Sequence, residues 1–347
     1  MPNVRISDLA AADALVAADI LPVVQPGGTR RASFAQIRDG VLAAAGDGLI
    51  VNGGCTVAQR GAVALDNAFR YGAVDGIAAR ADGTVDAGTI AQAAATLAAS
   101  GYASALTGVT LSGTTPAVAW RCRIEARDAA RLAGGPATFA CRVRHDASAA
   151  VGYTIAINAA DAADDFASVT AVAASPAPVD VASDTDTALS LTVPDMGACG
   201  NGVEVIVAAA CGAVTGAVFL IADLQLVPGS AALPFRPRPV AVEAALCRRY
   251  LCRIAAGTGR ANSASNVQMS LSHPGLRAAP AYAATAPLTL TDMVTADFTQ
   301  SQAGIGTVHD ATPDGGRVDL GYFSGLSAGT QMTLTAMGGV VLASAEL

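Results

Sequence analysis

Val118-Ala-Trp-Arg-Cys-Arg-Ile-Glu125 is the stretch of sequence that decides the fold. Apolar and polar side chains alternate along it, which is typical of a β-strand with one buried face. The apolar set that shares one face is Trp120, Cys122 and Ile124. The two arginines and Glu125 share the opposite face, which we expect to be the outer one.

Segments of the same kind follow at intervals set by clusters of Gly, Pro, Asp and Ser. They are Thr138–Arg144, Tyr153–Ile157, Leu189–Val193, Val203–Val207 and Ala217–Leu226. Many short alternating strands separated by turn residues favour an antiparallel β-sandwich. We therefore predict a mainly β protein with a jelly-roll-type sandwich over residues 102–232.

The sandwich is followed by Leu233-Pro-Phe-Arg-Pro-Arg-Pro-Val240, in which three prolines occur within six residues. This spacing excludes a regular helix or a central strand, so the segment is predicted to be an extended strap. Residues 241–253 then read as a helical turn that leads into a strand. Further alternating segments predict a C-terminal β tip domain, which together with the strap spans residues 233–347.

Two shorter regions precede the sandwich. Residues 1–45 are predicted to form a small α+β segment, with a strand near Asp19–Val24, a turn at Pro26–Gly28 and a helix that begins at Ser33. Residues 46–101 are Gly-rich and Asp-rich, and we expect them to form a connecting β region, or shoulder. The Gly46-Asp47-Gly48 stretch is a natural hinge between the two.

Composition excludes several functions. The 347-residue chain is 52% hydrophobic, much of it alanine, and its net charge is −7 with no basic run. Nucleic acid is therefore not an expected partner. No apolar run is long enough to predict a membrane span or a secretion signal. The seven cysteines and three histidines lack the spacing of a disulfide framework or a metal site, so we expect buried free thiols, no metal and no cofactor.

Several motifs resemble one family. "ISDL" with "LPVVQPGGTRRAS" near the N-terminus, "NGGCTVAQRG" at residues 52–61, "IADLQLVPGSAALPF" and the strap with its "LCRRY" sequel are similar to fibre and spike proteins of tailed bacteriophages and gene transfer agents. The sandwich resembles those of carbohydrate-binding modules. Ile77 stands where those fibres often carry tryptophan, so the resemblance implies no binding role for this residue.

The resemblance implies a structural protein on the surface of a virion or phage-like particle, made in the bacterial cytoplasm and released by lysis. It implies that residues 1–45 attach the chain to other head or tail proteins, and that the chain binds a cell-surface or capsular polysaccharide of the recipient cell. A homo-oligomer, most simply a trimer, is expected because Ala-rich domains bury modest apolar area. The alternative is an architectural fibre or collar protein that carries a separate receptor-binding subunit.

A polysaccharide-degrading spike is a further alternative, since Asp161, Asp164 and Asp165 are close in sequence. Glycoside hydrolysis needs two carboxylates about 5–9.5 Å apart across a groove. Neighbouring loop aspartates without aromatic side chains do not show that arrangement, so we expect no enzyme activity and at most a Ca²⁺ site.

Candidate sugar contacts are exposed aromatic side chains beside polar groups. In the tip domain Tyr282, Tyr322 and Phe323 are the candidates, against the alternative that they are buried strand residues. The sandwich, with loops rich in Asp, Ser, Thr and Asn, is the first choice for the binding domain.

Overall fold

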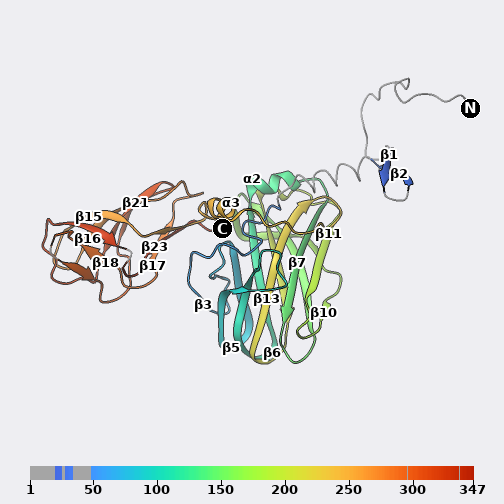
Figure 1. Ribbon diagram of the computed structural model, residues 1–347, viewed down its shortest axis with the longest axis horizontal. Coiled ribbons are helices and arrows are strands. Elements are labelled where there is room, and N and C mark those ends of the chain that lie inside the picture. Colours follow the sequence, from blue (N-terminus) through green and yellow to red (C-terminus); the bar gives the residue numbers. More distant parts are fainter. Residues whose placement is uncertain (1–19, 26–27, 34–47, 295, 336) are drawn as a thin grey trace, which may run out of the picture.

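The computed structural model describes residues 20–25, 28–33, 48–294, 296–335 and 337–347. Near the N-terminus β1 (Ile20–Gln25) pairs antiparallel with β2 (Gly28–Ser33). The strand expected at residues 19–24 is thus present, whereas the helix expected after Ser33 lies outside the described residues. Figure 1 shows the hairpin apart from the sandwich that follows.

Eleven strands of the described chain form the sandwich, and all their pairings are antiparallel. One layer contains the end of β6 (Tyr102–Glu125), β12 (Gly202–Ala210), β8 (Val151–Ala162), β9 (Asp165–Ala174) and β10 (Val179–Val181). The second layer contains the start of β6, β13 (Val214–Pro228), β7 (Ala137–His145) and β11 (Thr187–Val193). The strands predicted from alternation between residues 118 and 226 are all found.

A long two-stranded ribbon joins the two layers. Strand β5 (Ile77–Ala94) pairs with β6 along almost its whole length, and the short β3 (Val63–Ala64) and β4 (Arg70–Tyr71) pair with β5. The ribbon passes from one layer to the other at Gly83 and Gly113, whose φ angles are +105° and +121°. Glycine adopts such angles without the steric cost that a side chain brings.

This ribbon corrects the predicted domain boundary between residues 101 and 102. Residues 46–101 are not a separate shoulder, because β5 supplies an outer strand to both layers and residues such as Ile77 and Ile90 belong to the same core. Repeated glycines and aspartates hid the strand, since they interrupt the alternation on which the prediction relied. The sandwich therefore begins near residue 49.

The core lies between the two layers. It joins Trp120 and Tyr153 of the first layer to Phe139 and Phe219 of the second, each at most 1% exposed. His145 bridges the layers, because its ring centroid lies 6.2 Å from that of Tyr153 and 5.9 Å from that of Phe219. The predicted inner face of the opening stretch is confirmed, since Trp120 and its apolar neighbours in β6 are all buried.

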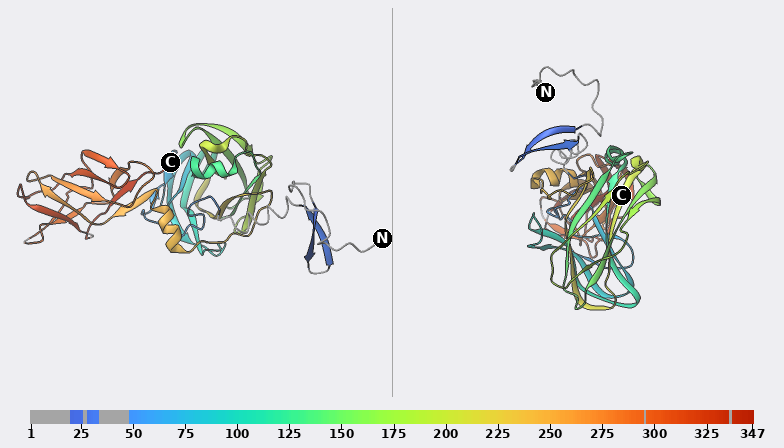
Figure 2. Two further views of the ribbon diagram at one scale, coloured as in Figure 1. Left: turned by 90° about the horizontal axis from the view of Figure 1, so that it is seen from above. Right: turned by 90° about the vertical axis from the view of Figure 1, so that its right-hand side faces the viewer.

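One end of the sandwich carries short helical turns, which are α2 (Ala126–Ala129), η2 (Ala130–Leu132) and η3 (Cys199–Asn201). The strap has no regular secondary structure, as predicted, and leads into α3 (Val240–Cys247) at the same end. From there the tip domain extends sideways from the sandwich, as Figure 1 and the left view of Figure 2 show.

The tip domain is built from two antiparallel sheets over one core that includes Met269, Leu290 and Leu334. The smaller sheet contains β14 (Leu251–Ile254), β23 (Val341–Ser344) and β17 (Ala281–Ala284). The larger contains, in spatial order, β19 (Asp297–Thr299), β18 (Thr289–Thr291), β22 (Gln331–Thr335), β15 (Gly257–Ala261), β16 (Val267–Ser272), β21 (Gly315–Leu320) and β20 (Val308–Thr312). A second β domain was predicted here, and it is found.

All seven cysteines lie in the described part of the chain as free thiols, and six of them are buried. Within the described ranges, no three His, Cys, Asp or Glu side chains gather as ligands for a metal ion. The helices among these residues are too short or too polar to cross a membrane.

Candidate functional site

The three aromatic residues predicted to contact sugar do not form one site. Phe323 is 5% exposed and packs in the tip core, so its ring is a core contact. Tyr322 is 48% exposed with a φ of +66°, and its ring lies against Gly304. Tyr282 is half-buried, and its hydroxyl lies 3.0 Å from Nε2 of His273.

Tyr282 and Tyr322 are also distant from each other. The Tyr282 hydroxyl packs against Gly316, which lies in β21 six residues before Tyr322. The strand ends at Leu320, two residues before Tyr322, and its four steps from Gly316 alone span roughly 13 Å. A sugar contact at Tyr322 or Tyr282 remains a prediction, and the two residues would have to act separately.

Each of the three neighbouring aspartates has its own partners. The carboxylate of Asp161 accepts hydrogen bonds from the hydroxyls of Ser168 and Thr170. Asp164 accepts one from the Ala126 amide at 2.7 Å, and Asp165 caps the turn that it begins. These hydrogen bonds stabilise the connection between β8 and β9, so the three aspartates have a structural role in this turn.

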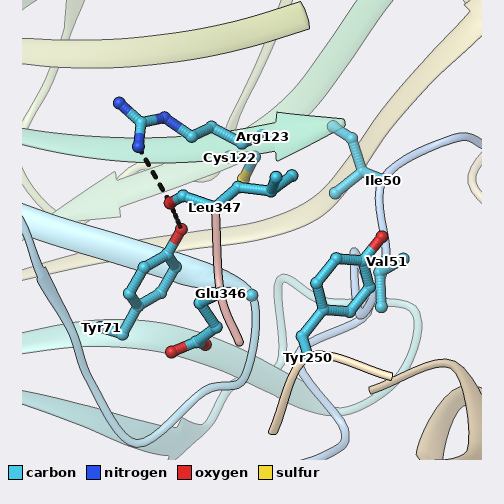
Figure 3. A pocket seen from close by; sticks show the side chains of 9 residues that line it. Ile50, Val51, Tyr71, Cys122, Arg123, Tyr250, Glu346 and Leu347 are labelled. Carbon is cyan, nitrogen blue, oxygen red and sulfur yellow. Dashed lines mark hydrogen bonds between the residues drawn. The ribbon is translucent and has the colours of Figure 1, made fainter. Parts of the chain in front are cut away.

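The seam between the sandwich and the tip domain holds a small hollow (Figure 3). The main-chain oxygen of Leu347 accepts hydrogen bonds from Tyr71 Oη at 2.7 Å and from Arg123 Nη1 at 2.9 Å. Tyr250 and Glu346 close the other sides. The hollow measures only about 20 Å³, room for a single water molecule, so it is a packing seam.

A larger groove lies on the outer face of the second layer, under the strap. Its volume is about 440 Å³, within the range of small-molecule sites. We call it the strap groove. Its floor is formed by outward side chains of β7 and β11, and its walls by β13, the loop after β5 and the strap. The lining residues used below are Ala140, Arg142, Ala188, Ser190, Asp223, Gln225 and Phe235.

The floor is low because its side chains are small. Outward positions alternate with core positions along β7, so Ala140 and Arg142 face out while Cys141 between them is buried. Strand pairing places Ala188 of β11 beside Arg142, and Ser190 beside Ala140. Small neighbours leave open space above the sheet, into which the Arg142 side chain projects.

The strap forms one wall and is held in place at both ends. The Gln225 side-chain amide donates to the main-chain oxygen of Leu233, and Arg238 pairs with Glu243 at 3.1 Å and donates to the Gly48 and Ile50 oxygens. These contacts fix the wall before any ligand arrives, which lowers the entropy cost of binding. The strap is therefore part of the groove as well as a linker.

Phe235 supplies the aromatic surface of the groove. Its ring lies against the flat Gly53-Gly54 segment, where an added Cβ would be 3.5 Å from the ring. Gly53 is itself required, because a Cβ there would collide with the Leu224 oxygen at 2.0 Å. The half-buried ring is supported on one side and lines the groove on the other.

Asp223 is the acidic group of the groove and is 4% exposed. It lies in a bulge of β13 with a φ of +54°, and both its oxygens accept from the Ala99 amide at 3.0 and 3.1 Å. Burial raises the pKa of its carboxyl, while the Ala99 hydrogen bond and the nearby Arg142 charge oppose that shift.

Two other hollows in the described chain are less suited to sugars. One, of about 690 Å³, lies beside Asp86, Asp146 and Thr215, and another, of about 500 Å³, beside Asp161 and Asp195. Neither is lined by an aromatic or basic side chain. The strap groove combines an aromatic face, a cation, an acid, an amide and a hydroxyl, the mixture that fixes a polar ligand.

The sequence prediction missed the strap groove. Its residues come from three strands and the strap, and nothing in the spacing shows that they meet. Two signals were available: Phe235 is an aromatic residue within a proline-rich segment, and the alternation of β7 places Arg142 on the outer face.

No known protein family has a sequence profile that matches this chain, and no curated protein is similar to it in sequence. Among solved structures, the chain is similar to the C-terminal family 22 carbohydrate-binding module of Clostridium thermocellum Xyn10B, with 12% identity, a TM-score of 0.31 and coverage of 48% of this chain and 98% of that one. It is also similar to the CBM22-1 xylan-binding domain of Paenibacillus barcinonensis Xyn10C, with 16% identity, a TM-score of 0.29 and coverage of 50% and 99%.

A third similar structure is the enzymatically active domain of tailspike protein 4 from bacteriophage CBA120. The identity is 10%, the TM-score is 0.33, and the match covers 52% of this chain and 21% of that one. Such low TM-scores transfer neither a ligand nor a mechanism, so we take the groove's chemistry from its own residues.

Proposed function

We propose that this protein is a fibre or spike on the surface of a virion or gene-transfer-agent particle, and that it binds a surface polysaccharide of the recipient cell in the strap groove. The observation that carries the proposal is the groove itself. It is open, preformed, and lined by an aromatic ring and several polar groups. The sequence motifs that resemble those of phage fibres suggest the particle context.

The groove explains how a sugar would be held. The Phe235 ring offers an apolar face to the C–H side of a sugar ring, while Ser190 and Arg142 offer hydrogen-bond donors to its oxygens. Such contacts are few, and a single groove of this kind binds with a Kd of roughly millimolar to micromolar, about −4 to −8 kcal/mol. Adhesion would then come from many copies on one particle.

In this proposal residues 1–45 attach the chain to a particle protein, and the sandwich and tip domain project outward. The chain acts by binding and not by cleaving the polysaccharide. It is made in the cytoplasm of the producing bacterium, and lysis releases it on particles.

The test is binding of the purified full-length chain to a glycan array and to extracted capsular polysaccharide. Phe235→Ala is expected to weaken binding about tenfold through the loss of the stacking face. Ser190→Trp fills the groove from an exposed floor position and is expected to abolish binding without disturbing the core. Tyr322→Ala tests the alternative site, because it removes the exposed aromatic ring that is predicted as a sugar contact in the tip domain.

If Tyr322→Ala weakens binding and both groove variants leave it intact, the site lies in the tip domain. If the wild-type chain binds no polysaccharide from any candidate recipient, the adhesin function is excluded. The architectural fibre or collar protein would then replace it.

A further inference from the structure

Arg142 is a positively charged residue of the strap groove whose guanidinium is available to a ligand. Its side chain makes no hydrogen bond or ion pair with any residue in the described part of the chain. Its cross-strand neighbours on the outer face, Ala222 and Ala188, have no polar group to offer. The next outward arginine on the same strand, Arg144, contrasts with it, because it pairs with Asp184 at 3.0 Å and Asp186 at 3.5 Å.

Asp223 is close enough to feel the charge of Arg142, but it does not pair with it. The Asp223 carboxylate is directed to the Ala99 amide, which both its oxygens bind. The Arg142 charge acts on Asp223 through space, and no hydrogen bond or ion pair joins the two side chains. The guanidinium therefore keeps its planar set of N–H donors free and exposed within a groove, a geometry that matches the two oxygens of a carboxylate or a phosphate.

We propose, on the basis of the polysaccharide-binding function above, that the strap groove selects an acidic saccharide, with Arg142 as the counter-ion of its anionic group. The sugar ring lies toward Phe235 and Ser190, and the anionic substituent lies over the alanine floor at Arg142. Because the whole protein carries a net charge of −7, an acidic polymer gains nothing from long-range attraction. Recognition must come from this local contact.

The experiment uses the full-length chain and three polymer probes in calorimetry or affinity electrophoresis. Polygalacturonate presents a carboxylate, its methyl ester is the neutral counterpart with the same backbone, and a phosphorylated mannan presents a phosphate. The wild-type chain is expected to bind at least one anionic probe about tenfold more tightly than the neutral ester. The preferred anionic probe identifies carboxylate or phosphate as the natural group.

Arg142→Gln is expected to remove this preference, lowering affinity for the anionic probe about tenfold and leaving the neutral ester unchanged. Arg142→Lys keeps the charge without the planar fork and should retain part of the preference. Arg144→Gln is the matched control, since it removes one positive charge from the same strand and face, two residues away, where the arginine is already paired. The thermal unfolding temperature of each variant verifies that it folds.

The outcomes separate this inference from the proposed function. If the neutral ester binds as tightly as the anionic probes, or if Arg142→Gln and Arg144→Gln reduce binding equally, the acidic specificity is overturned while polysaccharide binding stands. If the wild-type chain binds neither these probes nor extracted capsule, the proposed function fails together with the inference.

Discussion

At the scale of single residues, Asp75 shows how the sandwich tolerates a buried acid. Its carboxylate accepts one hydrogen bond from the main-chain amide of Gln59 at 3.0 Å and another from Nε2 of the same residue at 2.7 Å. Asp75 is only 2% exposed. Burial outweighs these bonds and raises the pKa of the carboxyl from 3.8 to about 6. The folded state thus holds this proton more tightly than the unfolded state does.

It follows that Asp75 favours folding most below pH 4 and loses that contribution as the pH rises through 6. Two pKa units correspond to roughly 3 kcal/mol. We expect the stability of the wild type relative to Asp75→Asn to fall by about 2–3 kcal/mol between pH 4 and pH 7, measured by urea unfolding. A difference between the two proteins that does not change with pH would contradict the assignment.

At the scale of elements, the β5–β6 ribbon depends on its glycine bend. A side chain at Gly83 would place its Cβ 2.9 Å from the Ser112 oxygen. The residue would also have to adopt a φ of +105°, an angle that residues with a side chain rarely adopt. Gly83→Ala is expected to destabilise the sandwich by about 1–3 kcal/mol, measured by chemical denaturation. Gly61→Ala is the control, because its Cβ would meet open space and should change stability by no more than about 0.5 kcal/mol. Equal effects would show that the bend is not strained.

The same ribbon shows what sequence could and could not predict. Alternation identified β7, β8 and β12 because each has one face in the core and one toward solvent, so periodicity reports burial directly. It failed for β5, where glycines break the pattern, and the sandwich was therefore assigned too short a range. The strap groove was beyond reach for another reason: its residues become neighbours only through strand pairing and the path of the strap.

At the scale of the whole molecule, the sandwich and the tip domain are joined by a charged cluster. The Glu125 carboxylate is 3% exposed and accepts from Arg249 at 2.9 Å and from Arg277 at 3.1 Å, two arginines that follow the strap. The Arg277 side chain is only 14% exposed. Glu125→Ala would therefore leave a largely buried positive charge with one negative partner fewer. We expect a loss of about 3 kcal/mol and a separate calorimetric transition for the tip domain.

The control for this coupling is Asp310→Ala, which breaks an ion pair with Arg317 in which both side chains are about half exposed or more. Pairs of that kind contribute only about 0–1 kcal/mol. A single cooperative transition in Glu125→Ala, unchanged from the wild type, would show that other contacts hold the two domains together.

The oligomer is the largest scale at which the chain is expected to act. Aromatic residues make up only 4% of the sequence and alanine fills much of the core, so each domain buries modest area and association would add to it. We predict a homotrimer with a mass three times 34.3 kDa, measured by light scattering at micromolar concentration. A trimer also changes adhesion, because linked sites can raise apparent affinity by about 10²–10⁴. Binding to surface-immobilised capsule should therefore greatly exceed binding to a short soluble fragment of it. A stable monomer, or equal affinity for the two ligands, would contradict the prediction.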